Sequence, residues 1–159
     1  MEFAGRSWPP QPGWLAIRQL LLRTSDYQRL LSASLKALPQ EACGLLSARF
    51  QEESAYLFLW LTPNEDPRPR RFHIGEQTVK EVSAAARARK EVLAGVFHSH
   101  AYQPPLPSPT DKRLAKDSAP FWLICAPHRA ELRAYIHTGG VFRRTKLSIR
   151  RDRMFDWFS

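Results

Sequence analysis

One short segment of the chain, residues 97–111, holds the side chains best suited to bind a metal ion. It contains His98 and His100, two residues apart, and Asp111 beyond a proline-rich loop. If the two histidines end a β-strand, both imidazoles point to the same face and Ser99 points to the other. Two imidazole nitrogens and one carboxylate oxygen leave a fourth tetrahedral position for water, as catalytic zinc sites require.

Each part of this segment also has a purely structural interpretation. A His-x-His pair on a strand is usually a matter of packing or surface. The sequence Ser-Pro-Thr-Asp is typical of a helix start, with Ser108 as N-cap, Pro109 as first residue and Asp111 near the positive end of the helix dipole. Capping and metal binding are compatible, because a capped helix start fixes where the Asp111 carboxylate points.

Hydrophobic patterning predicts the elements that must position these residues. The apolar segment 92–98 is a candidate central strand that ends at the histidines. Residues 42–48 predict a buried strand, with 56–62 as its hairpin partner. Further strands are expected over residues 14–22, 72–74, 121–126, 131–137 and 141–149.

Two longer helices complete the prediction. The first follows Thr24 or Ser25 as N-cap and ends before Pro39, and the second covers residues 76–91, rich in Ala, Glu, Lys and Arg. A short third helix starts at Ser108. The predicted fold class is therefore α/β, a mixed and largely antiparallel sheet flanked by two longer helices and a short one.

The sequence contains no internal repeat and no break in composition, which favours a single domain. We expect this domain to cover residues 14–149. A proline-rich N-terminal arm, residues 1–13, precedes it, and a basic, aromatic tail, residues 150–159, follows it.

The order and spacing of the candidate ligands resemble the signature of the JAMM (MPN+) metalloproteases. That signature runs His-x-His, seven residues, Ser, two residues, Asp, which here extends from His98 to Asp111. The family has an upstream glutamate on a Glu-x-Cys-Gly-Leu segment, and this chain has Glu41-Ala42-Cys43-Gly44-Leu45. The likeness covers about residues 14–149 and implies an MPN, cytidine-deaminase-like architecture.

The resemblance also implies a mechanism. His98, His100 and Asp111 would hold Zn²⁺, and Glu41 would take a proton from the activated water and deliver it to the leaving amine. Ser108 would donate a hydrogen bond to the developing oxyanion. The alternative for Glu41 is a surface ion pair, but its place beside an apolar strand favours a functional carboxylate, because unpaired burial is costly.

The substrate that the resemblance implies is a peptide or isopeptide bond after the C-terminus of a ubiquitin-like protein or a Gly-Gly-ended sulfur-carrier protein. One departure is Ala101, where the family often has proline. The interval from Asp111 to Phe121 is too short for the insertion of eukaryotic deubiquitinating members, so the chain is similar to compact prokaryotic ones. The alternatives are a catalytically silent scaffold, which would lack the ligand set, and a DNA-associated relative, which typically has Asn in place of Ser99.

Composition and net charge indicate which class of partner the protein binds. The 159-residue chain has a net charge of +9, but no stretch interleaves basic and aromatic residues, so an acidic protein is favoured over nucleic acid. No apolar run reaches the ~20 residues of a membrane span and no signal peptide is evident, so we expect a cytoplasmic protein.

The remaining cysteines and histidines have simple interpretations. Cys43 and Cys125 are expected to be buried free thiols, with a disulfide between them as the alternative. His73, His128 and His137 have no partner at ligand spacing and are expected in loops or at the surface.

Overall fold

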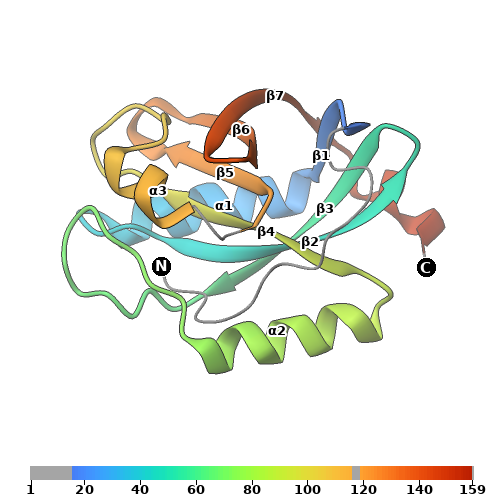
Figure 1. Ribbon diagram of the computed structural model, residues 1–159, viewed down its shortest axis with the longest axis horizontal. Helices are drawn as coiled ribbons and strands as arrows, with labels where there is room; N and C mark the ends of the chain where they lie inside the picture. Colours follow the sequence, from blue (N-terminus) through green and yellow to red (C-terminus); the bar gives the residue numbers. More distant parts are fainter. Residues whose placement is uncertain (1–15, 116–118, 159) are drawn as a thin grey trace.

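The computed structural model describes residues 16–115 and 119–158 (Figure 1). The predicted arm, residues 1–13, lies outside the described residues. The elements, in chain order, are β1 (Gln19–Arg23), α1 (Thr24–Ala37), β2 (Cys43–Gln51), β3 (Ser54–Thr62), α2 (Glu76–Ala88), β4 (Val92–Ser99), α3 (Pro109–Leu114), β5 (Phe121–Ala126), the 3-10 helix η3 (Pro127–Arg129), β6 (Glu131–Thr138), β7 (Val141–Arg150) and the 3-10 helix η4 (Asp152–Phe158).

The strands form a closed barrel in the order β1-β3-β2-β4-β5-β6-β7. The pairs β2–β3, β2–β4, β5–β6 and β6–β7 are antiparallel, whereas β1–β3, β1–β7 and β4–β5 are parallel. The mixed, mostly antiparallel sheet is thus confirmed, but its closure was not predicted. Closure depends on β1, which pairs with β3 and with the distant β7, and periodicity along the chain does not reveal such long-range pairs.

Two apolar clusters hold the helices against opposite faces of the strands. The inner cluster joins Leu30 of α1 to alternate strand residues such as Leu46 and Phe97. The outer cluster joins Val79 of α2 to the intervening residues, Val96 among them. Figure 1 shows α2 along one face of the β2, β3 and β4 layer and α1 on the opposite side of it.

Glycines bring the strands close together near the middle of the barrel. A Cβ on Gly44 of β2 would lie 2.6 Å from the carbonyl oxygen of Trp60, and one on Gly95 of β4 would lie 2.5 Å from that of Phe121. No side chain fits at either position, because real Cβ atoms do not approach backbone so closely. The glycine of the Glu-x-Cys-Gly segment therefore serves the packing of β2 against β3.

Two predicted details of the helices and strands are wrong. Residues 72–74 form no strand, although Phe72 and Ile74 are buried. Helix α1 has no side-chain cap from Thr24 or Ser25; instead the carboxylate of Asp152 accepts from the backbone N–H of Ser25 at 3.0 Å. This contact also attaches the C-terminal segment to the barrel.

A further correction concerns His137, expected in a loop or at the surface, which lies in β6 and is only 6% exposed. Cys43 and Cys125 are buried free thiols, as predicted. None of the described helices combines the length and the hydropathy needed to span a membrane.

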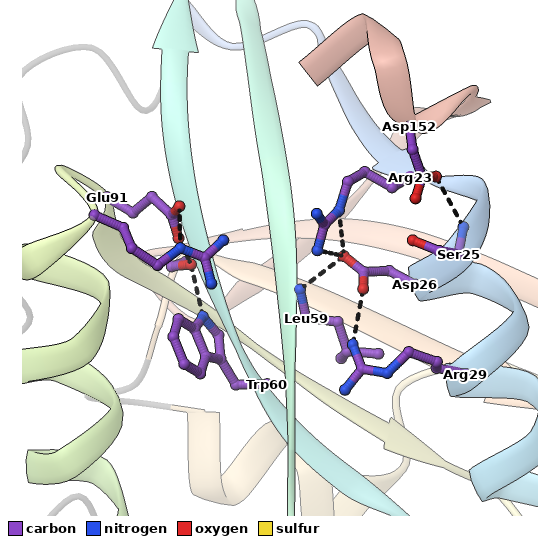
Figure 2. Close-up of polar contacts among 10 residues, drawn as sticks. Arg23, Ser25, Asp26, Arg29, Leu59, Trp60, Glu91 and Asp152 are labelled. Atoms are coloured by element: carbon purple, nitrogen blue, oxygen red, sulfur yellow. Dashed lines mark hydrogen bonds and ion pairs between the residues drawn. The ribbon is translucent and has the colours of Figure 1, made fainter. Parts of the chain in front are cut away.

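Two buried carboxylates lie away from the candidate ligands and are neutralised by arginines (Figure 2). Asp26 of α1 accepts hydrogen bonds from Arg23, from Arg29 and from the backbone N–H of Leu59, at 2.9 to 3.1 Å. Because Leu59 lies beyond the β1–β3 ladder, the carboxylate satisfies a backbone group that β1 does not reach.

Glu91 is the second of these carboxylates and directly precedes β4. Its carboxylate accepts from Ser47 Oγ at 2.6 Å and from Arg89 Nε at 2.9 Å, and Trp60 donates to the same serine at 2.8 Å. The network connects the start of β4 to β2 and β3. Both carboxylates therefore tie strands together through fully paired charges.

Candidate metal centre

The end of β4 presents two imidazoles on one face, as the alternation of side chains predicts. His98 lies within β4 and His100 directly follows it, and their Nε2 atoms are 3.1 Å apart. Ser99 points to the other side, where its Oγ accepts from the backbone N–H of Ala42 at 2.8 Å. Both histidines are buried, at 0% and 3% exposure.

Asp111 completes a three-residue cluster with these histidines. Its Oδ2 lies 3.2 Å from His98 Nε2 and 3.3 Å from His100 Nε2. Four ligands placed 2.0–2.1 Å from a tetrahedral zinc ion are separated from one another by roughly 3.3 Å. The three side chains thus have the donor set and the mutual spacing that fit zinc, and they leave a fourth position open.

The tautomer of His100 supports the presence of a cation between its Nε2 atom and the carboxylate of Asp111. His100 Nδ1 lies 2.8 Å from the carbonyl oxygen of Pro104, which can only accept, so Nδ1 carries the proton. In the neutral ring Nε2 is then a bare acceptor that faces the acceptor Oδ2 of Asp111. A cation between them satisfies both atoms, and the contact to Pro104 is the outer-shell support that metal-bound histidines use.

The proline-rich loop is itself fixed from β6. The hydroxyl of Tyr135 donates to the carbonyl oxygen of Pro105 at 2.7 Å, and both groups are buried. Tyr135 therefore holds the loop that orients His100. Tyr135 and the carbonyl oxygen of Pro104 were not predicted from the sequence, because a backbone acceptor and a residue from a distant strand leave no motif.

His98 is held by aromatic packing rather than by a hydrogen bond. Its ring stacks on Phe72 at 4.6 Å between centroids and meets Trp122 edge-on at 5.7 Å. Its Nδ1 is buried without a partner in the part of the chain that the structure describes. Phe72, expected to form a strand, instead covers this ligand.

The start of α3 orients Asp111 by a reciprocal capping box. Ser108 Oγ accepts from the backbone N–H of Asp111 at 3.0 Å, and Asp111 Oδ2 accepts from the backbone N–H of Ser108 at 2.8 Å. The predicted capping role of Ser108 is confirmed. The same oxygen that caps the helix faces both imidazoles, so helix formation and assembly of the cluster are coupled.

Glu41 reaches the cluster through the pairing of β2 with β4. The register pairs Cys43 with His98, and two hydrogen bonds between Ala42 and Ser99 extend it, one from the backbone N–H of Ser99 to the carbonyl oxygen of Ala42 and one from the backbone N–H of Ala42 to Ser99 Oγ. One step further, Glu41 lies opposite His100, on the face that carries the candidate ligands. The backbone of Glu41 is held by Asn64, whose Nδ2 donates to its carbonyl oxygen at 2.9 Å.

The electrostatics of the two site carboxylates differ. Burial raises the pKa of Glu41, and the nearby His98 and His100 only partly offset this, so its carboxyl group keeps a proton to a higher pH than an exposed glutamate does. Burial also acts to raise the pKa of Asp111, but the two imidazoles and the N–H of Ser108 outweigh it, and the net pKa is well below the usual range. One carboxylate is suited to carry a proton and the other to remain an anionic ligand.

Comparison with known proteins extends these observations. The family described as prokaryotic homologs of the JAB domain matches residues 24–138. A CysO-cysteine peptidase from Mycobacterium tuberculosis is 29% identical over 120 residues, which are 73% of this chain and 81% of that protein. The family match includes all the residues of the candidate centre.

Solved structures share the fold. The solution structure of a protein from Desulfitobacterium hafniense has a TM-score of 0.74 and 26% identity, and covers 84% of this chain and 94% of that one. A structure described as a metalloprotease-like zinc site in the proteasome and signalosome has a TM-score of 0.50 at 14% identity, and covers 84% and 99% of the two chains. The family match spans well over half of the sequence and agrees with the JAMM resemblance of its motif. The chain therefore belongs to the family of prokaryotic homologs of the JAB domain.

Proposed function

We propose that this protein is a zinc-dependent peptidase that hydrolyses the peptide or isopeptide bond at the C-terminus of a sulfur-carrier or ubiquitin-like protein. The observation that carries the proposal is the convergence of His98, His100 and Asp111 within hydrogen-bonding distance of one another, with Glu41 opposite His100. Family membership and the peptidase named among its relatives support it.

Each side chain has a distinct part in the proposed reaction. His98, His100 and Asp111 hold zinc, which, when bound, supplies Lewis-acid activation of a water and of the scissile carbonyl. Glu41 accepts the proton of the attacking water and returns it to the leaving amine, in keeping with the raised pKa of its carboxyl group.

Ser108 stabilises the developing oxyanion in this proposal. Its Oγ already accepts from the backbone N–H of Asp111, and a hydroxyl group that accepts still has its own O–H to donate. The capping contact therefore orients the hydroxyl without using its hydrogen. A preorganised donor of this kind stabilises negative charge that forms only in the transition state.

The substrate class follows from the relative and from the surface. The similar mycobacterial protein is a CysO-cysteine peptidase, which favours a sulfur-carrier protein with a residue added at its C-terminus. A groove between α1 and the β2–β3 hairpin reaches Glu41 and could receive an extended tail; it is lined by Lys36, Gln40, Cys43, Thr62 and Asn64, among others. The net charge of +9 favours an acidic carrier.

The test combines metal content with cleavage. The purified protein should contain about one zinc ion per chain, release a residue from a Gly-Gly-ended carrier, and lose the activity when a chelator removes the metal. His98→Ala should bind no zinc, whereas His128→Ala, which changes an exposed histidine outside the cluster, should bind it normally. A zinc-loaded wild-type protein that leaves every such carrier intact would overturn the proposal.

A further inference from the structure

Arg70, in the loop before α2, contacts Gln103 in the proline-rich loop that follows β4. In the amide orientation that turns the oxygen of Gln103 toward Arg70, this oxygen accepts from Arg70 Nε at 2.8 Å and from its terminal nitrogen at 3.2 Å. Gln103 directly precedes Pro104, whose carbonyl oxygen holds His100. The guanidinium of Arg70 thus lies beside the loop that orients a candidate metal ligand.

The segment that follows Arg70 is linked to the backbone of Glu41 through Asn64. Asn64 donates through the same Nδ2 atom to the carbonyl oxygens of Glu41 and of Arg71, at 2.9 and 3.0 Å. Two residues beyond Arg70, the ring of Phe72 stacks on His98. Arg70 therefore joins two segments that contact the candidate ligands, because Phe72 stacks on His98 and the loop of Gln103 and Pro104 holds His100.

The charge of Arg70 has no carboxylate partner. Within residues 16–115 and 119–158 it forms no ion pair, and its contact is with the neutral amide of Gln103. Its neighbour Arg68 differs, because Asp66 holds that guanidinium through two hydrogen bonds at 2.8 and 2.9 Å. Gln103 occupies two of the five N–H groups of Arg70, which leaves three available for an anion.

The conformation of Arg70 is consistent with a fixed position. Its φ of 63° lies in the left-handed region, which is unfavourable for a residue with a Cβ and persists where surrounding contacts impose it. The contact of Asn64 with Arg71 and the stacking of Phe72 on His98 hold the residues that follow Arg70. Gln103 holds its guanidinium beside the proline-rich loop, which reduces the freedom that Arg70 would lose on binding.

We infer that Arg70 binds the free α-carboxylate of the residue that is released, and so restricts the enzyme to a single residue beyond the scissile bond. This rests on the proposed function. A planar guanidinium with free N–H groups pairs bidentately with a carboxylate, and a carboxamide cannot replace that charge. Arg70 is then a specificity-determining residue, and Gln103 is the group that positions it.

The experiment uses two probes that differ at one group. A sulfur-carrier protein ending in Gly-Gly is extended by one cysteine, either as the free acid or as the primary amide. Wild-type protein should cleave the acid with a kcat/KM about 10- to 100-fold higher than the amide. Arg70→Gln should lose this preference through a slower reaction of the acid. Arg71→Gln removes one positive charge from the same loop and should keep the preference.

Binding separates recognition from turnover. In the zinc-loaded Glu41→Gln variant, calorimetry should show the same 10- to 100-fold preference for the acid, and the added Arg70→Gln change should remove it. Equal cleavage of both probes by wild type would overturn the inference and leave the proposed function standing. If Arg70→Gln lowered kcat/KM equally for both probes, the role of Arg70 would be only to support the loop, and the inference would be overturned. Absence of all cleavage with zinc bound would instead count against the proposed function itself.

Discussion

Four carboxylates are buried among the described residues, and they fall into two pairs with opposite surroundings. Asp26 and Glu91 are each paired with arginine and hydrogen-bonded to groups from neighbouring strands (Figure 2). Glu41 and Asp111 have no arginine or lysine partner within the same part of the chain, and both face His98 and His100.

The contrast shows which buried charges serve the fold and which serve the site. A buried carboxylate is costly unless its charge and lone pairs are satisfied, and the first pair meets this condition within the protein itself. The second pair meets it only in part, because the atoms that face Asp111 are ring nitrogens that would also bind a cation. The protein therefore accepts a less stable arrangement at one end of the β2–β4 pair, where a metal and a proton can be held.

Among the substitutions that test this difference between the two pairs of carboxylates, Glu41→Gln should have the largest effect on activity. The substitution keeps the shape of the side chain but removes its ability to carry a proton, so turnover should fall by about 10²–10⁴-fold. Zinc content should remain unchanged, because Glu41 is not among the clustered ligand atoms. Carrier cleavage by mass spectrometry and elemental analysis of the same sample measure the two quantities.

Asp111→Asn provides the matched control for Glu41→Gln, because it makes the same change on the other site carboxylate. It should weaken zinc binding. If Glu41→Gln instead lost zinc and Asp111→Asn kept it, the roles assigned to the two carboxylates would have to be exchanged.

The second largest effect is expected for substitution of an arginine-paired carboxylate, which should lower the stability of the protein and leave its activity unchanged. Asp26→Ala leaves the backbone N–H of Leu59 and two guanidinium groups without their acceptor, at a cost of about 3 kcal/mol in the free energy of unfolding. Urea denaturation measures this cost. Activity per folded molecule should be unchanged at a temperature well below the midpoint.

Asp152→Ala is a suitable control for Asp26→Ala. Its carboxylate caps Ser25 at the exposed start of α1, and we expect a loss of about 1 kcal/mol. A loss of cleavage in folded Asp26→Ala protein would show that the two pairs of carboxylates are not independent.

The same division explains what the sequence could predict. The imidazoles of His98 and His100 share a face because side chains alternate along a strand, and Ser108 caps α3 because its neighbours have the pattern of a helix start. These features are local. The expected role of Glu41 came from the family resemblance, and the register of β2 with β4 accounts for its position opposite His100.

The arginine-paired carboxylates could not be predicted in this way. Asp26 meets Leu59 across 33 positions and Glu91 meets Ser47 across 44, and no periodicity connects such residues. The absence of a strand at Phe72 has a related cause, because its ring is recruited to cover His98 rather than to extend a ladder. Local patterns thus predicted the three clustered candidate ligands, whereas closure of the barrel and the support of the site depend on tertiary contacts.

A smaller effect is expected at Ser108, where structure and chemistry meet in one side chain. Ser108→Ala should lower kcat by about 10²-fold through loss of an oxyanion donor and reduce stability by about 1 kcal/mol through loss of the cap. Ser108→Thr retains a hydroxyl and should retain most of both. If the alanine variant lost stability but cleaved at the rate of the threonine variant, capping alone would be the role of Ser108.

The smallest effect is a pH dependence of stability in the metal-free protein, and it depends on the unpaired state of Glu41. Burial raises the pKa of its carboxyl group above the value of 4.5 that it has when unfolded, and the attraction of His98 and His100 is too weak to reverse this. A raised folded-state pKa means that the contribution of Glu41 to stability is fully present below pH 4.5 and is lost as the pH rises through the folded-state value.

Glutamine at position 41 cannot ionise and escapes this loss. Wild-type and Glu41→Gln proteins should therefore differ least in stability below pH 4.5, and the variant should become progressively the more stable one toward neutral pH, by at most about 1.4 kcal/mol per pH unit. Urea denaturation of the two chelator-treated proteins between pH 4 and pH 8 measures the difference. A constant difference across this range, or a variant that becomes the less stable one as the pH rises, would show that Glu41 is as well paired as Asp26 and Glu91.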